Sequence, residues 1–187
     1  MIISTKLTGG MLVLLFFMSL LTLFYCFPFN SVNKNLRKTP GLKIFIVATV
    51  WSLLIVVFPI INFTDKLDVS FLIFFVQVLI FVIATILPFE IRDLNSDCKQ
   101  LRTIPQIIGV KNTKVLGSCL LIIFMILDCI QYVILNFISF KSILINAAVC
   151  LTTFTLILKS KENQSIYFSS FWVESLPILW LLLYIIL

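Results

Sequence analysis

The chain has 187 residues, of which 61% are hydrophobic and only 12% are charged, and its formal net charge is +6. A water-soluble domain of this size could not bury so much apolar surface, so the composition excludes a soluble globular protein and indicates a chain that crosses a lipid bilayer several times. The positive charge does not require a nucleic-acid partner, because cytoplasmic loops of membrane proteins carry an excess of Lys and Arg.

Six apolar stretches follow one another along the chain, each near the roughly 20 residues that a membrane-spanning helix needs. Because an unpaired backbone polar group is costly in hydrocarbon, each stretch is expected to be an α-helix. The predicted fold is therefore an all-α, polytopic transmembrane helical bundle of about six spans, in a single domain over residues 1–187. The expected spans are 11–28, 44–61, 71–89, 115–137, 143–158 and 171–187, of which the fifth is short.

Two of these spans carry features of their own. The first follows Lys6 and could be mistaken for a signal peptide, but a basic loop rather than a small-residue cleavage site comes after it. We therefore expect it to be retained as a span. The last span contains Pro177, which should kink its helix because proline lacks a backbone N–H and its ring clashes with the preceding turn.

The basic residues predict the orientation of the spans. Most of the 14 Lys and Arg residues fall in the loops 29–43, 89–114 and 159–170, whereas the other side holds only Lys6, Lys66 and Lys141. The positive-inside rule then places these three loops in the cytoplasm and both termini outside. The expected location is a cytoplasmic or inner membrane, with the chain passing through it several times.

Two carboxylates, Asp93 and Asp97, lie four residues apart where the third span meets its basic loop. On a helix such residues share one face, with Cβ atoms roughly 5–6 Å apart, and Mg²⁺ commonly takes one or two protein carboxylates and fills its shell with water and phosphate oxygens. The residues therefore indicate a metal–diphosphate site at a membrane surface. The alternative is an ordinary solvated loop, since a bare Asp-x-x-x-Asp is common.

Basic residues near this pair are candidates for binding phosphate. Arg92, Lys99 and Arg102 lie close to the carboxylates. Arg37 and Lys38 lie in the loop that is expected on the same side of the membrane. Arginine can contact phosphate oxygens in pairs, and lysine provides a point charge. The alternative explanation for all of them is the general cytoplasmic excess of basic residues.

Asp128 lies inside the fourth span, and an ionisable residue within a membrane is a candidate functional site. Its neighbours Gln131 and Asn136 offer a second explanation, in which Asp128 is a hydrogen-bonding group that helps helices pack. The sequence leaves both open. The absence of His removes the imidazole metal ligand and the most common general base from any site in this chain.

Residues 93–97, called here the acidic segment, resemble a known motif. The string Asp93-Leu-Asn-Ser-Asp97, with Thr103-x-Pro105 and Gly109 behind it, is similar to the second aspartate motif of the UbiA-type intramembrane prenyltransferases. In addition, Tyr25-x-x-Pro28, followed by basic residues and Gly41, resembles the basic loop that precedes this motif in the family. The turn-like run from Thr103 to Gly109 belongs to the same resemblance.

The resemblance implies a specific activity. The family has nine spans, and two aspartate motifs hold Mg²⁺ and an isoprenyl diphosphate, whose isoprenyl group passes to a lipophilic acceptor. Asp93 and Asp97 would then be metal ligands, and Arg37, Lys38, Lys99 and Arg102 would bind the diphosphate. The expected partners are an isoprenyl diphosphate, the acceptor and the lipid bilayer, without nucleic acid.

The chain also departs from the family pattern. Its six spans match the last six of nine, and no Asp or Glu precedes Tyr25 where the first motif would be expected. The loop after Asp97 is short and lacks the usual Gly-Lys before Thr103. We therefore expect an N-terminally truncated UbiA-like domain, or a diverged relative whose missing half comes from a partner or an oligomer. The other hypotheses are a non-catalytic remnant or subunit, and a small transporter that uses Asp128.

Overall fold

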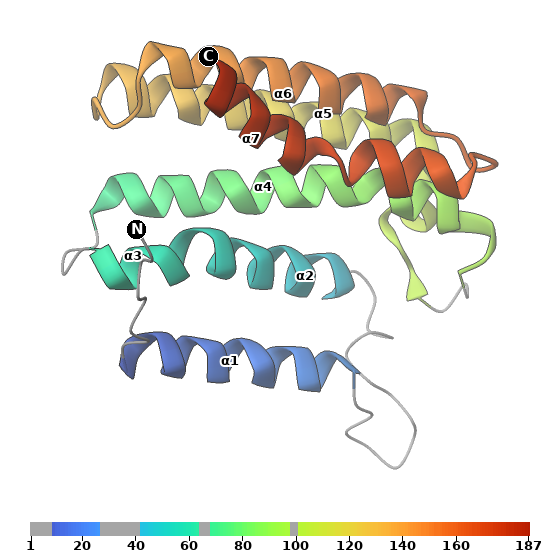
Figure 1. Ribbon diagram of the computed structural model, residues 1–187. Coiled ribbons are helices and arrows are strands. Elements are labelled where there is room, and N and C mark those ends of the chain that lie inside the picture. Colours follow the sequence, from blue (N-terminus) through green and yellow to red (C-terminus); the bar gives the residue numbers. More distant parts are fainter. Residues whose placement is uncertain (1–8, 27–41, 64–67, 98–100) are drawn as a thin grey trace. The chain divides into compact units, whose positions relative to one another are not determined.

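A computed structural model of the chain describes residues 9–26, 42–63, 68–97 and 101–187 (Figure 1). Within these ranges every regular element is a helix, which confirms the all-α prediction. Five helices are long and apolar enough to cross a membrane, and a shorter apolar helix covers Gly9–Leu23. The chain is thus a multi-pass membrane protein. The five long helices are Leu42–Ile61, Val69–Asn95, Ile104–Val133, Phe140–Lys159 and Phe168–Ile186.

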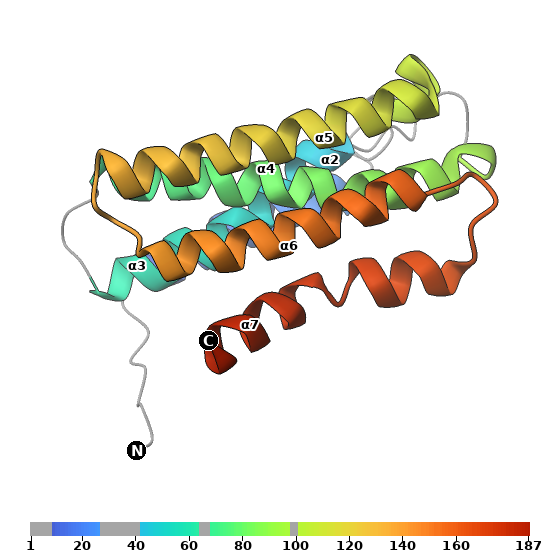
Figure 2. The same ribbon diagram turned by 90° about the horizontal axis from the view of Figure 1, so that it is seen from above.

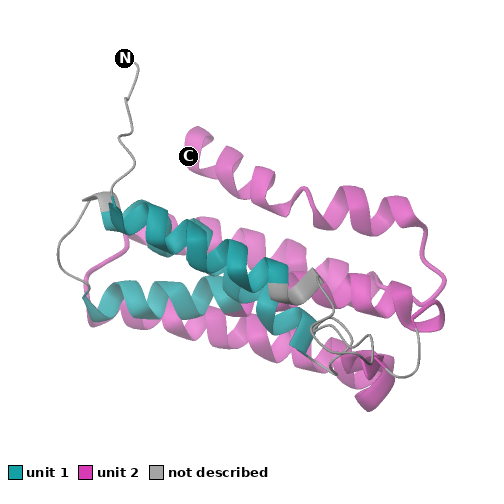
Figure 3. Ribbon diagram, turned by 90° about the horizontal axis from the view of Figure 1, so that it is seen from below, with its two compact units in different colours: residues 1–79 teal, residues 80–187 magenta. Residues whose placement is uncertain are grey.

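The chain forms two compact units, Met1–Leu79 and Ile80–Leu187 (Figure 3). In the first unit, α1 (Gly9–Cys26) packs against α2 (Leu42–Ser52) and α3 (Phe58–Phe63). A buried stripe at four-residue spacing runs along this second span through Ile44, Ala48, Ser52 and Val56. Residues at this spacing lie on one side of a helix, so this side is covered while the opposite side is exposed to lipid.

The second unit contains the end of α4 (Val69–Arg92), the short 3₁₀ turn η3 (Asp93–Asn95), and three further spans. These spans are α5 (Ile104–Val133), α6 (Phe140–Lys159), and η5 (Phe168–Val173) with α7 (Leu176–Ile186). Figure 2 shows α6 between α5 and α7, and α6 packs against both. The core of the unit consists of Phe81, Ala84, Leu121, Phe124, Val149, Cys150, Ile157, Val173 and Leu176.

Both ends of the loop between α4 and α5 differ from the sequence-based expectation. The basic loop predicted at 89–114 is much shorter, because α4 continues to Arg92 and α5 begins at Ile104. The start of α5 is fixed locally: the Thr103 N–H donates to Gln106 Oε1 at 3.1 Å, and Pro105 occupies the first turn, where its missing N–H costs nothing. The expected turn through Gly109 is therefore a helical turn that ends in a kink, with Gly109 at φ 78°.

The fifth span is longer than expected because it has a cap. Ser139 Oγ accepts a hydrogen bond from the Ser142 N–H at 3.2 Å, so α6 starts at Phe140 rather than at residue 143. A serine at this position supplies one of the acceptors that the first turn of a helix lacks.

In two spans the helix changes from α to π shortly before a proline. The π-helix η2 (Leu53–Val57) precedes Pro59 in α3, and the Phe58 N–H reaches back to the Leu53 carbonyl. The π-helix η5 precedes Pro177, and the helix breaks at residues 174–175, which confirms the kink expected from Pro177. In each case the wider turn accommodates the proline ring, which would clash with the carbonyl four residues earlier.

Gly117 is a point of close packing between spans of the second unit. A Cβ at this position would lie 3.0 Å from both Ile157 Cδ1 and Leu87 Cδ1. Small residues let membrane helices approach closely, and packing is a main source of their association. Gly117 therefore sets the distance at which α5 meets α6 and the end of α4.

We expect Gly117→Leu to destabilise the protein by about 1–3 kcal/mol, because the larger side chain overpacks this contact. The measurement is thermal or denaturant unfolding in detergent micelles. Cys119→Leu is the matched control, since Cys119 lies two residues further along α5 and is exposed. Equal stability of the two variants would show that the contact at Gly117 can relax without cost.

Candidate functional site

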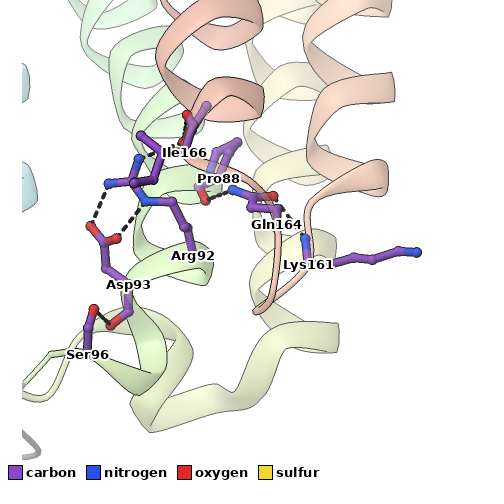
Figure 4. A network of polar contacts seen from close by, with 8 residues as sticks. Pro88, Arg92, Asp93, Ser96, Lys161, Gln164 and Ile166 are labelled. Atoms are coloured by element: carbon purple, nitrogen blue, oxygen red, sulfur yellow. Dashed lines mark hydrogen bonds and ion pairs between the residues drawn. The ribbon is translucent and has the colours of Figure 1, made fainter.

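The acidic segment follows the end of α4, where Arg92 holds Asp93 with two hydrogen bonds. Arg92 Nε lies 2.6 Å from Asp93 Oδ1, and Nη2 lies 3.0 Å from Oδ2 (Figure 4). The third arm, Nη1, donates to Ser169 Oγ at 2.7 Å. The guanidinium also lies over the Phe89 ring, 5.4 Å from its centre, which is within cation–π range. Arg92 therefore orients Asp93 and joins it to the last span.

The loop between α6 and η5 is fastened to the same helix end. Gln164 Nε2 donates to the Pro88 carbonyl at 2.9 Å, and Gln164 Oε1 accepts from the Lys161 N–H at 3.0 Å. Ser169 Oγ lies 3.2 Å from the Ile166 carbonyl, to which it donates. In Figure 4 the Lys161 side chain extends away from the Arg92–Asp93 pair. The loop therefore supports the acidic segment through its amide and hydroxyl groups.

Asp97 lies one turn beyond Asp93. The Asp97 N–H donates to the Asp93 carbonyl at 2.8 Å, so the two residues are related as in a helical turn, although the element at Asp93 is a 3₁₀ helix. Gln106 Nε2 donates to the Asp97 carbonyl at 3.3 Å. Within the part of the chain that the structure describes, Asp97 Oδ2 is buried and has no hydrogen-bond partner, although a buried polar atom normally has one.

A hollow of about 670 Å³ lies beside this turn, lined by Leu94, Arg102, Pro105, Gln106 and Ile107. Arg102 is exposed and has φ 43°, a left-handed conformation that costs a non-glycine residue of order 1–3 kcal/mol and is often found at functional sites. Of the predicted phosphate-binding residues, Arg102 therefore borders the space next to the acidic segment. Lys99, Arg37 and Lys38 lie outside the described residues.

The carboxylates fit a divalent cation in kind. Mg²⁺ prefers oxygen ligands and keeps several waters, and Asp97 Oδ2 is a buried carboxylate oxygen without a protein partner in the described ranges. Each Asp93 oxygen retains a lone pair beyond its bond to Arg92. No group of three or more His, Cys, Asp or Glu that could hold a metal comes together among the described residues, so water or phosphate oxygens would have to complete the shell.

Comparison of the chain with protein-family models, with curated proteins and with solved structures gave no match.

Asp128 belongs to a separate polar network inside the second unit. Its side chain is 1% exposed, and its oxygens lie 3.1 and 2.9 Å from Asn146 Nδ2, which donates to them. Asn146 Oδ1 in turn accepts from Trp180 Nε1 at 2.9 Å. These contacts link α5, α6 and α7 through side chains. They support the packing explanation for Asp128.

The network lies beside an aromatic cluster. The Trp180 ring is 5.0 Å from Phe81 and 6.2 Å from Phe124, both edge-on. The sequence-based interpretation named Asn136 as a neighbour of Asp128, but Asn136 is exposed beyond the end of α5. It did not name Asn146 or Trp180 as partners of Asp128. Asn146 could have been found from the sequence, because an asparagine within an apolar span needs a hydrogen-bond partner in hydrocarbon.

We expect Arg92→Lys to loosen the loop at 160–169, because an ammonium cannot hold two carboxylate oxygens and a hydroxyl in the planar geometry of a guanidinium. The measurement is hydrogen–deuterium exchange of peptides from this loop and from the 93–97 segment. Arg102→Lys is the control, because Arg102 is exposed. Faster exchange should appear in Arg92→Lys, and to a smaller extent in Ser169→Ala. If exchange is unchanged in Arg92→Lys and in Ser169→Ala, the loop is held by other contacts.

We expect Asn146→Leu to destabilise the protein by about 1–3 kcal/mol. The substitution removes the amide that donates to the Asp128 carboxylate and accepts from Trp180 Nε1, so these groups lose a hydrogen-bond partner inside the protein. Trp180→Phe should cost less, about 0.6 kcal/mol, the average for a hydrogen bond between membrane helices. Unfolding in micelles measures both. Thr155→Val on the same helix is the control, because the Thr155 hydroxyl is exposed and donates to the Thr152 carbonyl of α6 itself. An Asn146→Leu variant as stable as this control would argue against a structural network.

Proposed function

We propose that the chain is a UbiA-like membrane prenyltransferase homologue that binds an isoprenyl diphosphate with Mg²⁺ at Asp93 and Asp97 and passes the isoprenyl group to a lipophilic acceptor. The observation that supports this most is the buried Asp97 Oδ2, which has no hydrogen-bond partner in the described part of the chain. It lies one turn from a carboxylate that Arg92 holds in place. The two residues follow each other by one turn at the end of a span.

The chain's own residues would divide the work in this site. Asp93 and Asp97 would hold the ion, and Arg92 would keep Asp93 in position through its two hydrogen bonds. Arg102, on the hollow beside Leu94, would contact phosphate oxygens. When bound, Mg²⁺ supplies charge stabilisation to the departing diphosphate. The apolar spans would accommodate the isoprenoid chain and keep water from the reacting carbon.

The orientation of the protein belongs to the same proposal. The exposed basic residues of the second unit include Lys111, Lys159 and Lys161, near the helix ends that meet the acidic segment. By the positive-inside rule this end would face the cytoplasm, where a soluble diphosphate group has access to it.

A non-catalytic subunit is the second candidate. It is supported by the small donor set, since only two carboxylates are proposed as ligands and no larger acidic group is found in the described ranges. In that case the chain would bind the diphosphate poorly by itself and a partner would complete the site. A transporter built on Asp128 has less support, because that carboxylate is hydrogen-bonded to Asn146.

We expect Asp93→Asn and Asp97→Asn each to lower Mg²⁺-dependent binding of a radiolabelled isoprenyl diphosphate by at least roughly 10- to 100-fold, because losing a direct ligand should cost no less than losing a group that only orients one. Retention of the label by the purified chain, with Mg²⁺ or with a chelator, measures binding. A chromatographic assay of labelled product measures transfer.

Asp68→Asn is the matched control for this experiment. Asp68 precedes the other end of α4 and accepts a hydrogen bond from the Val69 N–H at 2.7 Å, a cap that asparagine can replace. Binding without transfer in the unaltered chain would favour the subunit. Mg²⁺-dependent binding that survives both substitutions would refute the proposed site.

A further inference from the structure

An apolar groove of about 740 Å³ runs between α5 and α6 of the second unit. Leu121 and Cys150 form its floor and are 4% and 6% exposed, whereas Ile122, Ile126 and Leu151 stand along its edges and are exposed. Its lining includes two small side chains, Ser118 of α5 and Ala147 of α6.

The groove has the dimensions and surface of a site for a hydrocarbon chain. Along α5 its lining extends from Ser118 to Ile134, about 24 Å at 1.5 Å per residue. One leaflet occupies about half of the roughly 30 Å hydrocarbon core, so an extended acyl chain fits within this length. Because both helices are long and apolar enough to span the membrane, the groove opens toward lipid rather than water.

One end of the groove carries fixed positive charge. Lys114 Nζ of α5 donates to the Leu158 carbonyl of α6 at 2.7 Å, which places an ammonium group between the two helices just beyond Ser118. An ammonium has three donors, so two remain for oxygens of a ligand. Lys111 is exposed and lies seven residues before Ser118, on the same helical face. Lys159, the last residue of α6, is also exposed.

The two ends of the groove differ in charge. Near its other end the described residues provide one exposed basic side chain, Lys141 at the start of α6. Acidic side chains are also present at the lysine-rich end. Asp93 is held by Arg92, Asp97 lies one turn beyond it, and Glu162 lies within 3.5 Å of Asn95 Nδ2, in the loop that supports the acidic segment. The lysine-rich end therefore favours an anionic headgroup.

We propose that the groove between α5 and α6 is a binding site for an anionic phospholipid, with one acyl chain along the groove and the headgroup phosphate on Lys114 and Lys111. Basic sites between membrane helices on the cytoplasmic side are known to recognise anionic headgroups. The site is independent of the proposed prenyl transfer, since it shares no residue with the acidic segment or its supporting loop.

The test uses the whole chain in nanodiscs that contain a photoactivatable phosphatidylglycerol with a diazirine in its acyl chain, or the phosphatidylcholine equivalent. After irradiation, mass spectrometry maps the labelled peptides. We expect phosphatidylglycerol to label residues 118–134 and 147–154 preferentially. The double variant Lys111→Gln, Lys114→Gln should lower the affinity for phosphatidylglycerol roughly 30-fold, given the strength of attraction per basic residue near a membrane. Lys141→Gln is the control and should change nothing.

A second variant tests the groove rather than the charge. Ala147→Phe should fill the hollow and reduce labelling by both lipids, while circular dichroism and melting confirm that the variant is folded. Equal labelling by both lipids in the unaltered chain would overturn the proposal. So would a cross-link from the groove to a second copy of the chain, or displacement of the lipid by inorganic phosphate alone.

Discussion

A solvent that cannot form hydrogen bonds determines where the polar atoms of this protein are found. In hydrocarbon each unpaired donor or acceptor costs several kcal/mol, so buried polar side chains must meet one another or the backbone. Asn146 shows the result: its amide donates to Asp128 and its oxygen accepts from Trp180. A single side chain thereby connects three helices, and the surrounding apolar packing keeps water away from these bonds.

Because of the same constraint, the two polar regions of the second unit, the Asp128 network and the acidic segment, have different roles. The Asp128 network lies within the spans, and its hydrogen bonds are made between protein groups. The acidic segment lies at a helix end, where Arg92 satisfies Asp93 and ties it to Ser169. There Asp97 keeps a buried oxygen without a hydrogen-bond partner in the described part of the chain. The helix end therefore has capacity for a ligand, whereas Asp128 is already engaged in packing.

The sequence predicted the spans well because hydrophobicity over about 20 residues is a strong local signal. It was less accurate at span ends, where one hydrogen bond decides the boundary: Gln106 starts α5 and Ser139 starts α6 outside the apolar runs. The pair Asp93 and Asp97 was visible from its spacing. Ser169 was not, because it lies 77 residues from Arg92 in sequence, and such pairings depend on tertiary packing.

The π-helical segments before Pro59 and Pro177 have a consequence for how this sequence can vary. A π-turn holds one more residue than an α-turn while the flanking helix keeps its angular phase. Shortening Leu53–Val57 by one residue would thus keep the faces of α2 and α3 aligned on either side of it. The same deletion in the middle of α5 would rotate the downstream half by about 100° and turn its core-facing side toward lipid. Tolerance of length changes is therefore concentrated beside the two prolines.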